Sequence, residues 1–237
     1  MGKRIIPQRR GRGSPRYLAI SRRNVGRVTH PKITQETTKG QIKDLLNCPG
    51  HYSPIAQVVY ENGEHALMMA PQGIKVGDEV TSGLSGDIVS GNVMELRNIP
   101  EGTPIYNIES MPGDGGKFCR TSGCFGRIVS KTGDSITIVL PSKKEKKFSP
   151  GCRANIGIIA GSGRKEKPFL KAGKMYFARR ARNKLYPIVS ATSMNAVDHP
   201  FGGSSSCRHK CPKQSSRNDP PGRKVGSLAP RRTGRKR

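Results

Sequence analysis

The stretch MNAVDHPFGG at positions 194–203 places an aspartate directly beside a histidine, Asp198 and His199. A carboxylate that orients an imidazole, which then takes a proton from a nucleophile, is a common catalytic arrangement. Adjacent residues in an extended loop, however, point their side chains to opposite sides. Asp198 is therefore badly placed to hold His199, and the nearby Ser193 and Ser204 have no supporting pattern. The sequence argues against a catalytic dyad, and we predict no catalytic residue.

The same stretch has the residues that a loop needs in order to approach RNA closely. Pro200 fixes the backbone, while Gly202 and Gly203 free it, so that main-chain atoms can come near a nucleic acid. Asn195 and His199 can then donate hydrogen bonds to phosphates, ribose 2′-hydroxyls or base edges. We interpret the stretch as an RNA-facing loop.

Cys207, His209 and Cys211 in SSCRHKC are residue types that bind zinc. Alternate residues of a strand lie roughly 6.5–7 Å apart, which is too far to share one ion unless the chain coils tightly. A fourth ligand would have to come from Cys48 or Cys152. A zinc site stays open as the alternative, but we favour an RNA-facing polar loop and predict no metal or other cofactor. Zinc analysis before and after Cys207→Ser would decide.

Two further groups of residues have ordinary structural explanations. Cys119 and Cys124 in CRTSGC are spaced too widely for a paired zinc knuckle, so we expect buried barrel cysteines. The glycines of residues 113–117 and 161–164 are not followed by the GK[ST] of a phosphate-binding loop. We expect turns at strand ends.

Composition identifies the class of partner. The chain has 237 residues, with 43 Lys and Arg against 16 Asp and Glu, a formal net charge of +27. So large an excess needs a polyanion to neutralise it. No apolar run approaches the roughly 20 residues of a membrane span, and no basic amphipathic helix or signal peptide is evident. We therefore expect a cytoplasmic nucleic-acid-binding protein with reduced cysteines and no membrane partner.

The charge is segregated along the chain. Residues 1–27 hold nine bases and no acid, whereas residues 55–140 hold ten acids and six bases. This division predicts an ordinary folded middle with cationic extensions, which order on a phosphate backbone. The stretch 164–184 is a further basic segment, and we expect it to be partly helical around Lys174–Arg182.

The middle of the chain reads as short β-strands separated by turns every 8–15 residues. The expected strands are residues 55–60, 65–70, 73–80, 104–110, 126–130, 135–142 and 154–161. Asn62-Gly63 between the first two is a strong hairpin signal. No convincing helix of more than two turns lies between them, and a break at residues 111–117 divides them into two groups. We predict two adjoining small β-barrels.

Several of these stretches together resemble one known family. They are MGKRI and QRRGRGS at the start, GNVMELRNIPEGTPIYNIE, KTGDSITIVLPS, GCRANIGIIAGSGRKEKPFLKAG, MNAVDHPFGG, and PPGRKVGSLAPRRTGRKR at the end. In this order they resemble the universal ribosomal protein family L-two (L2) of the large subunit, in its archaeal and cytosolic-eukaryotic form. The resemblance implies a mainly β chain with an OB-fold barrel followed by an SH3-like barrel and long irregular basic extensions.

The resemblance also implies domain bounds and a function. We expect an N-terminal extension over 1–35, the OB-fold barrel over 36–112, the SH3-like barrel with the basic segment over 113–190, and a C-terminal extension over 191–237. The implied role is a non-enzymatic constituent of the cytoplasmic large subunit. Such a protein is a primary binder of ribosomal RNA that supports subunit association, tRNA binding and the peptidyl-transferase region. Neighbouring ribosomal proteins and the small subunit at the interface are the other implied partners, without a small-molecule substrate.

The residues that we expect to contact RNA lie in the extensions, the basic segment and the loop. They are Lys3, Arg4, Arg9, Arg10, Arg12, Arg22, Arg23, Lys174, Arg179, Arg180, Arg182, Met194, Asn195, Asp198, His199, Pro200, Gly202, Gly203, Arg223, Lys224, Arg231 and Arg232.

The chain departs from the family pattern inside the loop. The family's first histidine falls on His199, which we interpret as structural support for an RNA active centre. Ala196, Phe201 and Ser204 stand where the family has a proline, a second histidine and a third glycine. Phe201 can only stack or pack, which argues against a two-histidine mechanism.

Two other classes of function fit the sequence less well than a ribosomal one. An RNA-modifying or metal-dependent enzyme would use His199 or the cysteines at 207 and 211, but its acids should gather in a pocket, and here they are dispersed. A DNA compactor would explain the charge but not the barrels, which are typical of single-strand and shape recognition.

Overall fold

The structure, a computed structural model, describes residues 2–19, 21–32, 37–84, 86–203 and 213–232. The chain forms two compact units. Residues 21–168 make up one, here called the barrel unit, and residues 1–20 with 169–237 make up the other, here called the terminal unit. None of the described helices is long and apolar enough to cross a membrane.

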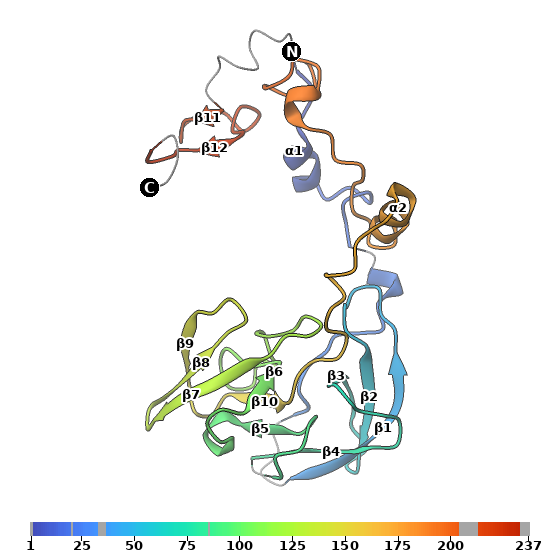
Figure 1. Cartoon of the computed structure of the whole chain (residues 1–237), viewed down its shortest axis with the longest axis vertical. Helices are drawn as coiled ribbons and strands as arrows, with labels where there is room; N and C mark the ends of the chain where they lie inside the picture. Colours follow the sequence, from blue (N-terminus) through green and yellow to red (C-terminus); the bar gives the residue numbers. More distant parts are fainter. Residues whose placement is uncertain (1, 20, 33–36, 85, 204–212, 233–237) are drawn as a thin grey trace. The chain divides into compact units, whose positions relative to one another are not determined.

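The barrel unit contains ten strands hydrogen-bonded in the order β3-β2-β1-β4-β5-β10-β6-β7-β8-β9 (Figure 1). Their bounds are β1 Thr38–Leu46, β2 Ile55–Tyr60, β3 His65–Met69, β4 Glu79–Ser82, β5 Val93–Glu95, β6 Pro104–Tyr106, β7 Gly126–Thr132, β8 Ser135–Val139, β9 Glu145–Phe148 and β10 Arg153–Ile156. All pairings in this sheet are antiparallel except β4 with β5. Short 3₁₀ turns lie at Ser21–Arg23 and Leu96–Asn98.

The two groups of strands each enclose an apolar core. Ile42, Val58 and Val80 belong to the core of β1–β4, and the core of β5–β10 contains Ile136 and Ile138. In β8 these isoleucines alternate with less buried neighbours, which is the period of a half-buried strand. The mainly β class is therefore confirmed, with two cores as expected for an OB-fold barrel followed by an SH3-like barrel.

A third cluster joins the two cores. It includes Val28, Ile55, Met69, Tyr106 and Ile159, all 0–1% exposed. The hydroxyl of the fully buried Tyr106 donates to the Met69 carbonyl over 3.0 Å, so the polar end of this ring is satisfied. The domain bounds at 36–112 and 113–190 stay a prediction, because the compact units divide the chain elsewhere.

A buried ion pair in the barrel unit contacts the segment that precedes β1. Arg153 Nη2 lies 2.9 Å from Glu109 Oε1, with both side chains at most 7% exposed. Arg153 Nη1 also donates to the Pro31 carbonyl over 2.7 Å. Burial opposes ionisation of Glu109, but the hydrogen bonds and charge of Arg153 outweigh it and hold the pKa of this carboxyl below its usual range.

His30 lies beside this pair. Its Nε2 is 2.7 Å from the carbonyl oxygen of Asn107, and because a carbonyl only accepts, Nε2 carries the hydrogen. Burial, followed by the charge of Arg153, lowers the pKa of His30 to about 4. The ring is thus a neutral donor at physiological pH.

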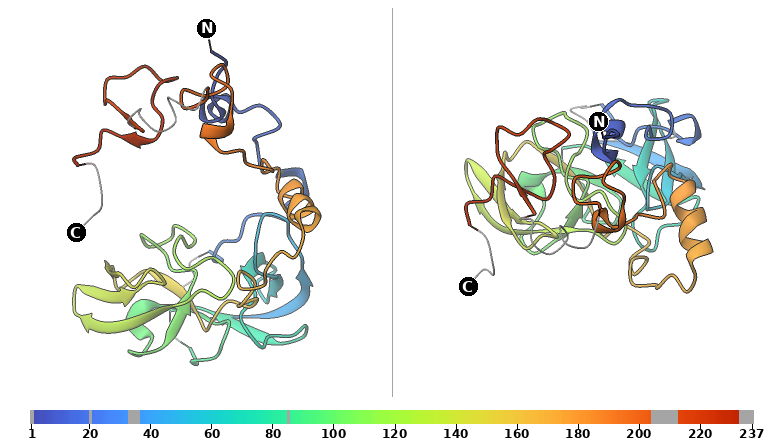
Figure 2. Two further views of the ribbon diagram at one scale, coloured as in Figure 1. Left: turned by 45° about the horizontal axis from the view of Figure 1, so that its top comes forward. Right: turned by 90° about the horizontal axis from the view of Figure 1, so that it is seen from above.

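The terminal unit has little regular structure. Helix α1 spans Ile6–Gly11, α2 spans Ala172–Arg180, a 3₁₀ turn covers Ala191–Ser193, and β11 Gln214–Ser215 pairs in parallel with β12 Ser227–Leu228. The helix expected around Lys174–Arg182 is therefore confirmed, with its start two residues earlier. Figure 2 shows α1 beside the segment that precedes residue 203. Just before α1, the Lys3 amide donates to the Val197 carbonyl over 2.7 Å.

Candidate nucleic-acid interface

The stretch 194–203, here called the His199 loop, is closed by its own backbone. The amides of Asp198 and His199 both donate to the carbonyl of Asn195, over 3.0 and 3.2 Å. The Gly203 amide donates to the carbonyl of Met194 over 3.2 Å. These bonds satisfy main-chain groups locally, so the loop keeps its shape without a sheet or helix around it.

Gly202 sits at the point where the loop closes. A Cβ atom there would stand 2.4 Å from the carbonyl oxygens of both Met194 and Asn195. Its neighbour Gly203 has φ +117°, which L side chains rarely adopt. The two glycines are therefore required by close approach and by backbone conformation respectively.

The imidazole of His199 has a defined orientation. The Phe201 amide donates to its Nδ1 over 3.0 Å, and since an amide nitrogen only donates, the neutral ring carries its hydrogen on Nε2. Partial burial lowers the pKa of His199. The Phe201 ring lies 5.1 Å from the imidazole at 57°, so Phe201 packs against the histidine. His199 is a neutral ring with Nε2–H available to donate.

Asp198 does not contact that ring. Its Oδ1 lies 3.3 Å from Nζ of Lys3, and both side chains are more than a third exposed. A pair so exposed adds little stability, but it directs the Asp198 carboxylate toward Lys3 of the N-terminal segment rather than toward the imidazole. The two members of the suspected dyad thus make separate contacts.

A cleft of about 380 Å³ lies against the His199 loop. Three chain segments line it: the N-terminal residues, the loop and the turn before β12. The lining residues are Gly2, Lys3, Arg4, Ile5, Gln8, Ala196, Val197, His199, Pro200, Pro220, Gly222 and Arg223. Lys3, Arg4 and Arg223 are exposed cations, so the cleft offers positive charge and a neutral imidazole donor together. Such a set suits phosphate and ribose oxygens.

The cleft brings together five of the residues singled out from the sequence: Lys3, Arg4, His199, Pro200 and Arg223. Asn195 is exposed on the same loop, whereas Met194, Gly202 and Gly203 are partly covered. Sequence reasoning missed Gln8, whose Oε1 accepts from the Ile5 amide over 3.1 Å and fixes the start of α1. A glutamine three residues after the N-cap position, with a proline in the first turn, is typical of a helix start, and this pattern of Ile5, Pro7 and Gln8 could have revealed α1.

The other expected RNA-binding cations are spread over both units. Arg9, Arg10 and Arg12 lie in or just after α1, and Arg9 Nε donates to the Arg4 carbonyl over 2.9 Å. The remainder occupy the Ser21–Arg23 turn, α2 and its end, and the C-terminal segment: Arg22, Arg23, Lys174, Arg179, Arg180, Arg182, Lys224, Arg231 and Arg232. All are exposed except Arg179 and Arg182, which are partly covered.

The zinc alternative at Cys207, His209 and Cys211 lies outside the described residues. Within the described ranges, no three His, Cys, Asp or Glu side chains gather as a metal site would require. Cys119 and Cys124 are free thiols of intermediate exposure, rather than fully buried ones. Burial raises the pKa of Cys119 to about 12, which makes it an unreactive thiol.

Comparison with known proteins gives matches over nearly the whole chain. Residues 10–82 match the family model described as Ribosomal Proteins L2, RNA binding N-terminal domain, and residues 89–224 match Ribosomal Proteins L2, C-terminal domain. Large ribosomal subunit protein uL2 of Methanothermobacter thermautotrophicus is 48% identical over 100% of both chains. The protein of that name from Methanopyrus kandleri is 47% identical over 99% of this chain and 98% of its own.

Proposed function

The chain belongs to the ribosomal protein L2 family, and on that premise we propose that it is a structural constituent of the cytoplasmic large ribosomal subunit that binds ribosomal RNA. The family match supports the ribosomal role and the RNA partner. The primary binding of large-subunit RNA, the support of subunit association and tRNA binding, and the maintenance of the peptidyl-transferase region are the finer parts of the proposal. Neighbouring ribosomal proteins and the small subunit are its further proposed partners.

One observation carries the finer proposal: the neutral His199 ring at the wall of a cationic cleft. Its Nδ1 is occupied by the Phe201 amide, so Nε2 is a donor and has no free lone pair. To act as a general base the ring would have to exchange tautomers and lose that hydrogen bond. A donor beside Lys3, Arg4 and Arg223 is suited instead to hold RNA oxygens in place.

The proposed RNA contacts are of two kinds, one for affinity and one for positioning. Cations of the extensions neutralise phosphates and supply most of the affinity. The His199 loop, with its fixed shape and few charges, positions one piece of RNA. The protein thereby supports an active centre that RNA builds, and no catalytic side chain is assigned to the protein.

His199→Ala in assembled large subunits tests this role. Loss of one donor is expected to slow peptide-bond formation or subunit joining about fivefold, the equivalent of about 1 kcal/mol. The free energy of unfolding of the free protein should change by less than about 1 kcal/mol, because the ring is only partly buried. Rates on purified subunits and urea unfolding give the two numbers.

His65→Ala is the matched control, since His65 is an exposed histidine at the start of β3 in the barrel unit. It should leave both rates unchanged. Normal peptide-bond formation and normal joining by His199→Ala subunits would show that the assigned role of the loop is wrong.

A further inference from the structure

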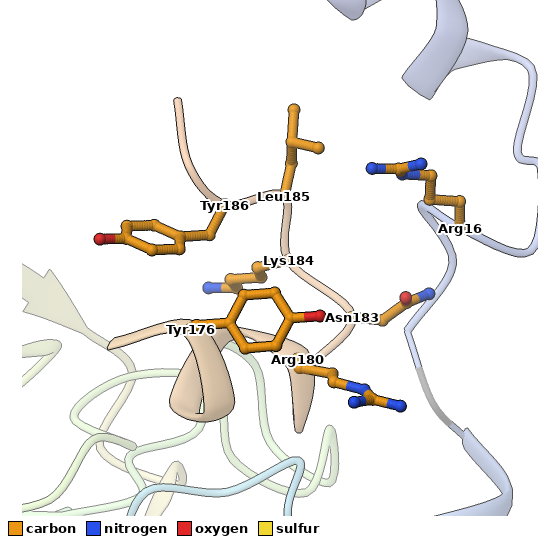
Figure 3. A pocket seen from close by; sticks show the side chains of 7 residues that line it. All are labelled: Arg16, Tyr176, Arg180, Asn183, Lys184, Leu185 and Tyr186. Carbon is orange, nitrogen blue, oxygen red and sulfur yellow. The ribbon is translucent and has the colours of Figure 1, made fainter. Parts of the chain in front are cut away.

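A second concave site lies in the terminal unit, away from the His199 loop in sequence. A pocket of about 140 Å³ is enclosed by α2, by the segment that follows it and by Arg16. Figure 3 shows Arg16 on one wall, Tyr176 and Arg180 on α2, and Lys184 and Tyr186 on the following segment. We call it the Tyr176 pocket.

The end of α2 fixes one wall of this pocket. Asn183 has φ +51°, in the left-handed region. The Lys184 amide donates to the Arg179 carbonyl over 2.9 Å and the Asn183 amide to the Arg180 carbonyl over 3.0 Å. These two bonds form a Schellman motif, which ends the helix and sends the chain back across its last turn. Arg180, in that last turn, and Lys184, on the returning segment, both line the pocket.

The Asn183 side chain fixes the opposite wall. Its amide nitrogen donates to the carbonyls of Pro15 and Leu18, over 2.6 and 2.8 Å. Arg16 lies between these two acceptors in the chain, so its backbone is held against the end of α2. The pocket is therefore built by hydrogen bonds between segments more than 160 residues apart.

Three cations line the pocket without a carboxylate among its lining residues: Arg16, Arg180 and Lys184. No ion pair to any of them is found in the part of the chain that the structure describes. Like charges around one pocket repel one another, and an anion in the pocket would lower that cost. The charge thus indicates a phosphate.

Two aromatic rings indicate more than a phosphate. Tyr176 is 43% exposed, so part of its ring is open to solvent, and Figure 3 shows the ring between the side chains of Arg180 and Lys184. Tyr186 is half-buried on the other side. Unpaired bases stack on tyrosine rings while arginines hold their phosphates, whereas paired bases present no free face. A duplex would use the cations and leave the rings unused.

We propose that the Tyr176 pocket binds one unpaired nucleotide of ribosomal RNA, whose base stacks on Tyr176 and whose phosphate is held by Arg16, Arg180 and Lys184. This rests on the proposed function, because it needs the chain to be assembled on RNA. The cations alone would bind any phosphate, whereas the Tyr176 ring would also select an unstacked base.

Chemical probing of ribosomal RNA in large subunits that contain Tyr176→Ala tests the site. One unpaired base, or two adjacent ones, should become several-fold more reactive toward a base-specific reagent. Tyr176→Phe keeps the ring and should restore protection. Phe169→Ala removes an exposed aromatic of the same unit that does not line the pocket, and should leave reactivities unchanged. Arg16→Gln with Arg180→Gln should expose the ribose of the same nucleotide to hydroxyl radicals.

The outcomes separate this inference from the proposed function. If the wild-type chain does not sediment with large subunits, the proposed function fails. If it does, and Tyr176→Ala changes no base reactivity or only those that Phe169→Ala also changes, the pocket assignment is overturned.

A second measurement covers a Tyr176→Ala chain that does not assemble. The free full-length protein is titrated with two RNA hairpins that differ only in one bulged adenosine. Wild type should prefer the bulged hairpin at least about fivefold, as one stacked base would give, and Tyr176→Ala should bind both equally. Equal binding by wild type would overturn the assignment.

Discussion

At the level of single residues, the chemistry of the His199 loop is decided by a main-chain group. The sequence separates Asp198 from His199 by simple alternation, and the structure pairs Asp198 with Lys3. The partner of the ring, the Phe201 amide, has no side-chain signature and could not be found from residue types. Phe201 was recognised as a packing residue, and its ring does pack on His199.

Gly202→Ala should disrupt the loop, because the new Cβ would meet two backbone oxygens at 2.4 Å and neither can move without opening the turn. We expect subunits with this variant to lose at least as much activity as His199→Ala subunits. Gly133→Ala is the control, since nothing lies within 4 Å of a Cβ there. Peptide-bond formation and subunit joining report the result, and wild-type rates for Gly202→Ala would contradict the close approach.

At the level of elements, Arg153 joins β10, the Glu109 carboxylate and the Pro31 carbonyl. Arg153→Met would leave the carboxylate buried without its counter-charge, at a cost of about 3–5 kcal/mol. Urea unfolding followed by far-ultraviolet circular dichroism measures this loss. Lys147→Ala, at an exposed position of β9, should cost less than about 0.5 kcal/mol. Equal stability of the two variants would show that the ion pair does not hold this joint.

Adding Glu109→Gln to Arg153→Met should recover part of the loss, because an amide is cheaper to bury than an unpaired carboxylate. A double variant no more stable than Arg153→Met alone would point to packing rather than charge as the cause.

His30 makes the barrel unit sensitive to acid. The pKa of His30 is about 4 in the folded chain, against a usual 6.5. Between these pH values His30 is therefore protonated in the unfolded chain and neutral in the folded chain. The contribution of neutral His30 to the free energy of unfolding should therefore be complete above pH 6.5. It should fall as the pH drops from about 6.5 to about 4. His30→Gln should flatten this slope, while His65→Gln, at an exposed histidine, should retain it. Identical slopes for His30→Gln and wild type would contradict a neutral buried His30.

The strands show which parts of the fold a sequence reveals. The hairpin of β2 and β3 was predicted within a residue, because Asn62-Gly63 separates two apolar runs. Strand β1 was missed because only Gly40 and Ile42 of its nine residues are buried, and β9 because three of its four residues are exposed and charged. The strand expected at 73–80 was wrong over most of its length. Gly73 and Gly77 adopt positive φ in turns, and β4 begins only at Glu79.

Helix α1 and the two parallel strands of the terminal unit also escaped prediction. Alternation and apolar periodicity report burial, and α1 buries no residue. Cations in an RNA-bound extension are placed by the partner rather than by a core. The clefts of the terminal unit depend on contacts between segments far apart in the sequence, such as Asn183 with Pro15, which no local pattern encodes.

At the level of the whole molecule, the division of charge matches the division of structure. Ten acids lie within residues 55–140, inside the barrel unit, whereas the terminal unit has none in residues 1–20 and only Asp198 and Asp219 in residues 169–237. The barrels therefore fold on ordinary apolar cores, and the cations outside them are left for a polyanion. A protein so charged needs a polyanion to neutralise it, and phosphate contacts make such binding salt-dependent.

Sedimentation of a cell lysate tests the central claim most directly. At physiological ionic strength the protein should migrate with large ribosomal subunits, and digestion of the lysate with RNase should release it to the top of the gradient. A protein that sediments alone before RNase treatment, and that converts a small substrate, would contradict the assignment as an RNA-bound constituent of the large subunit.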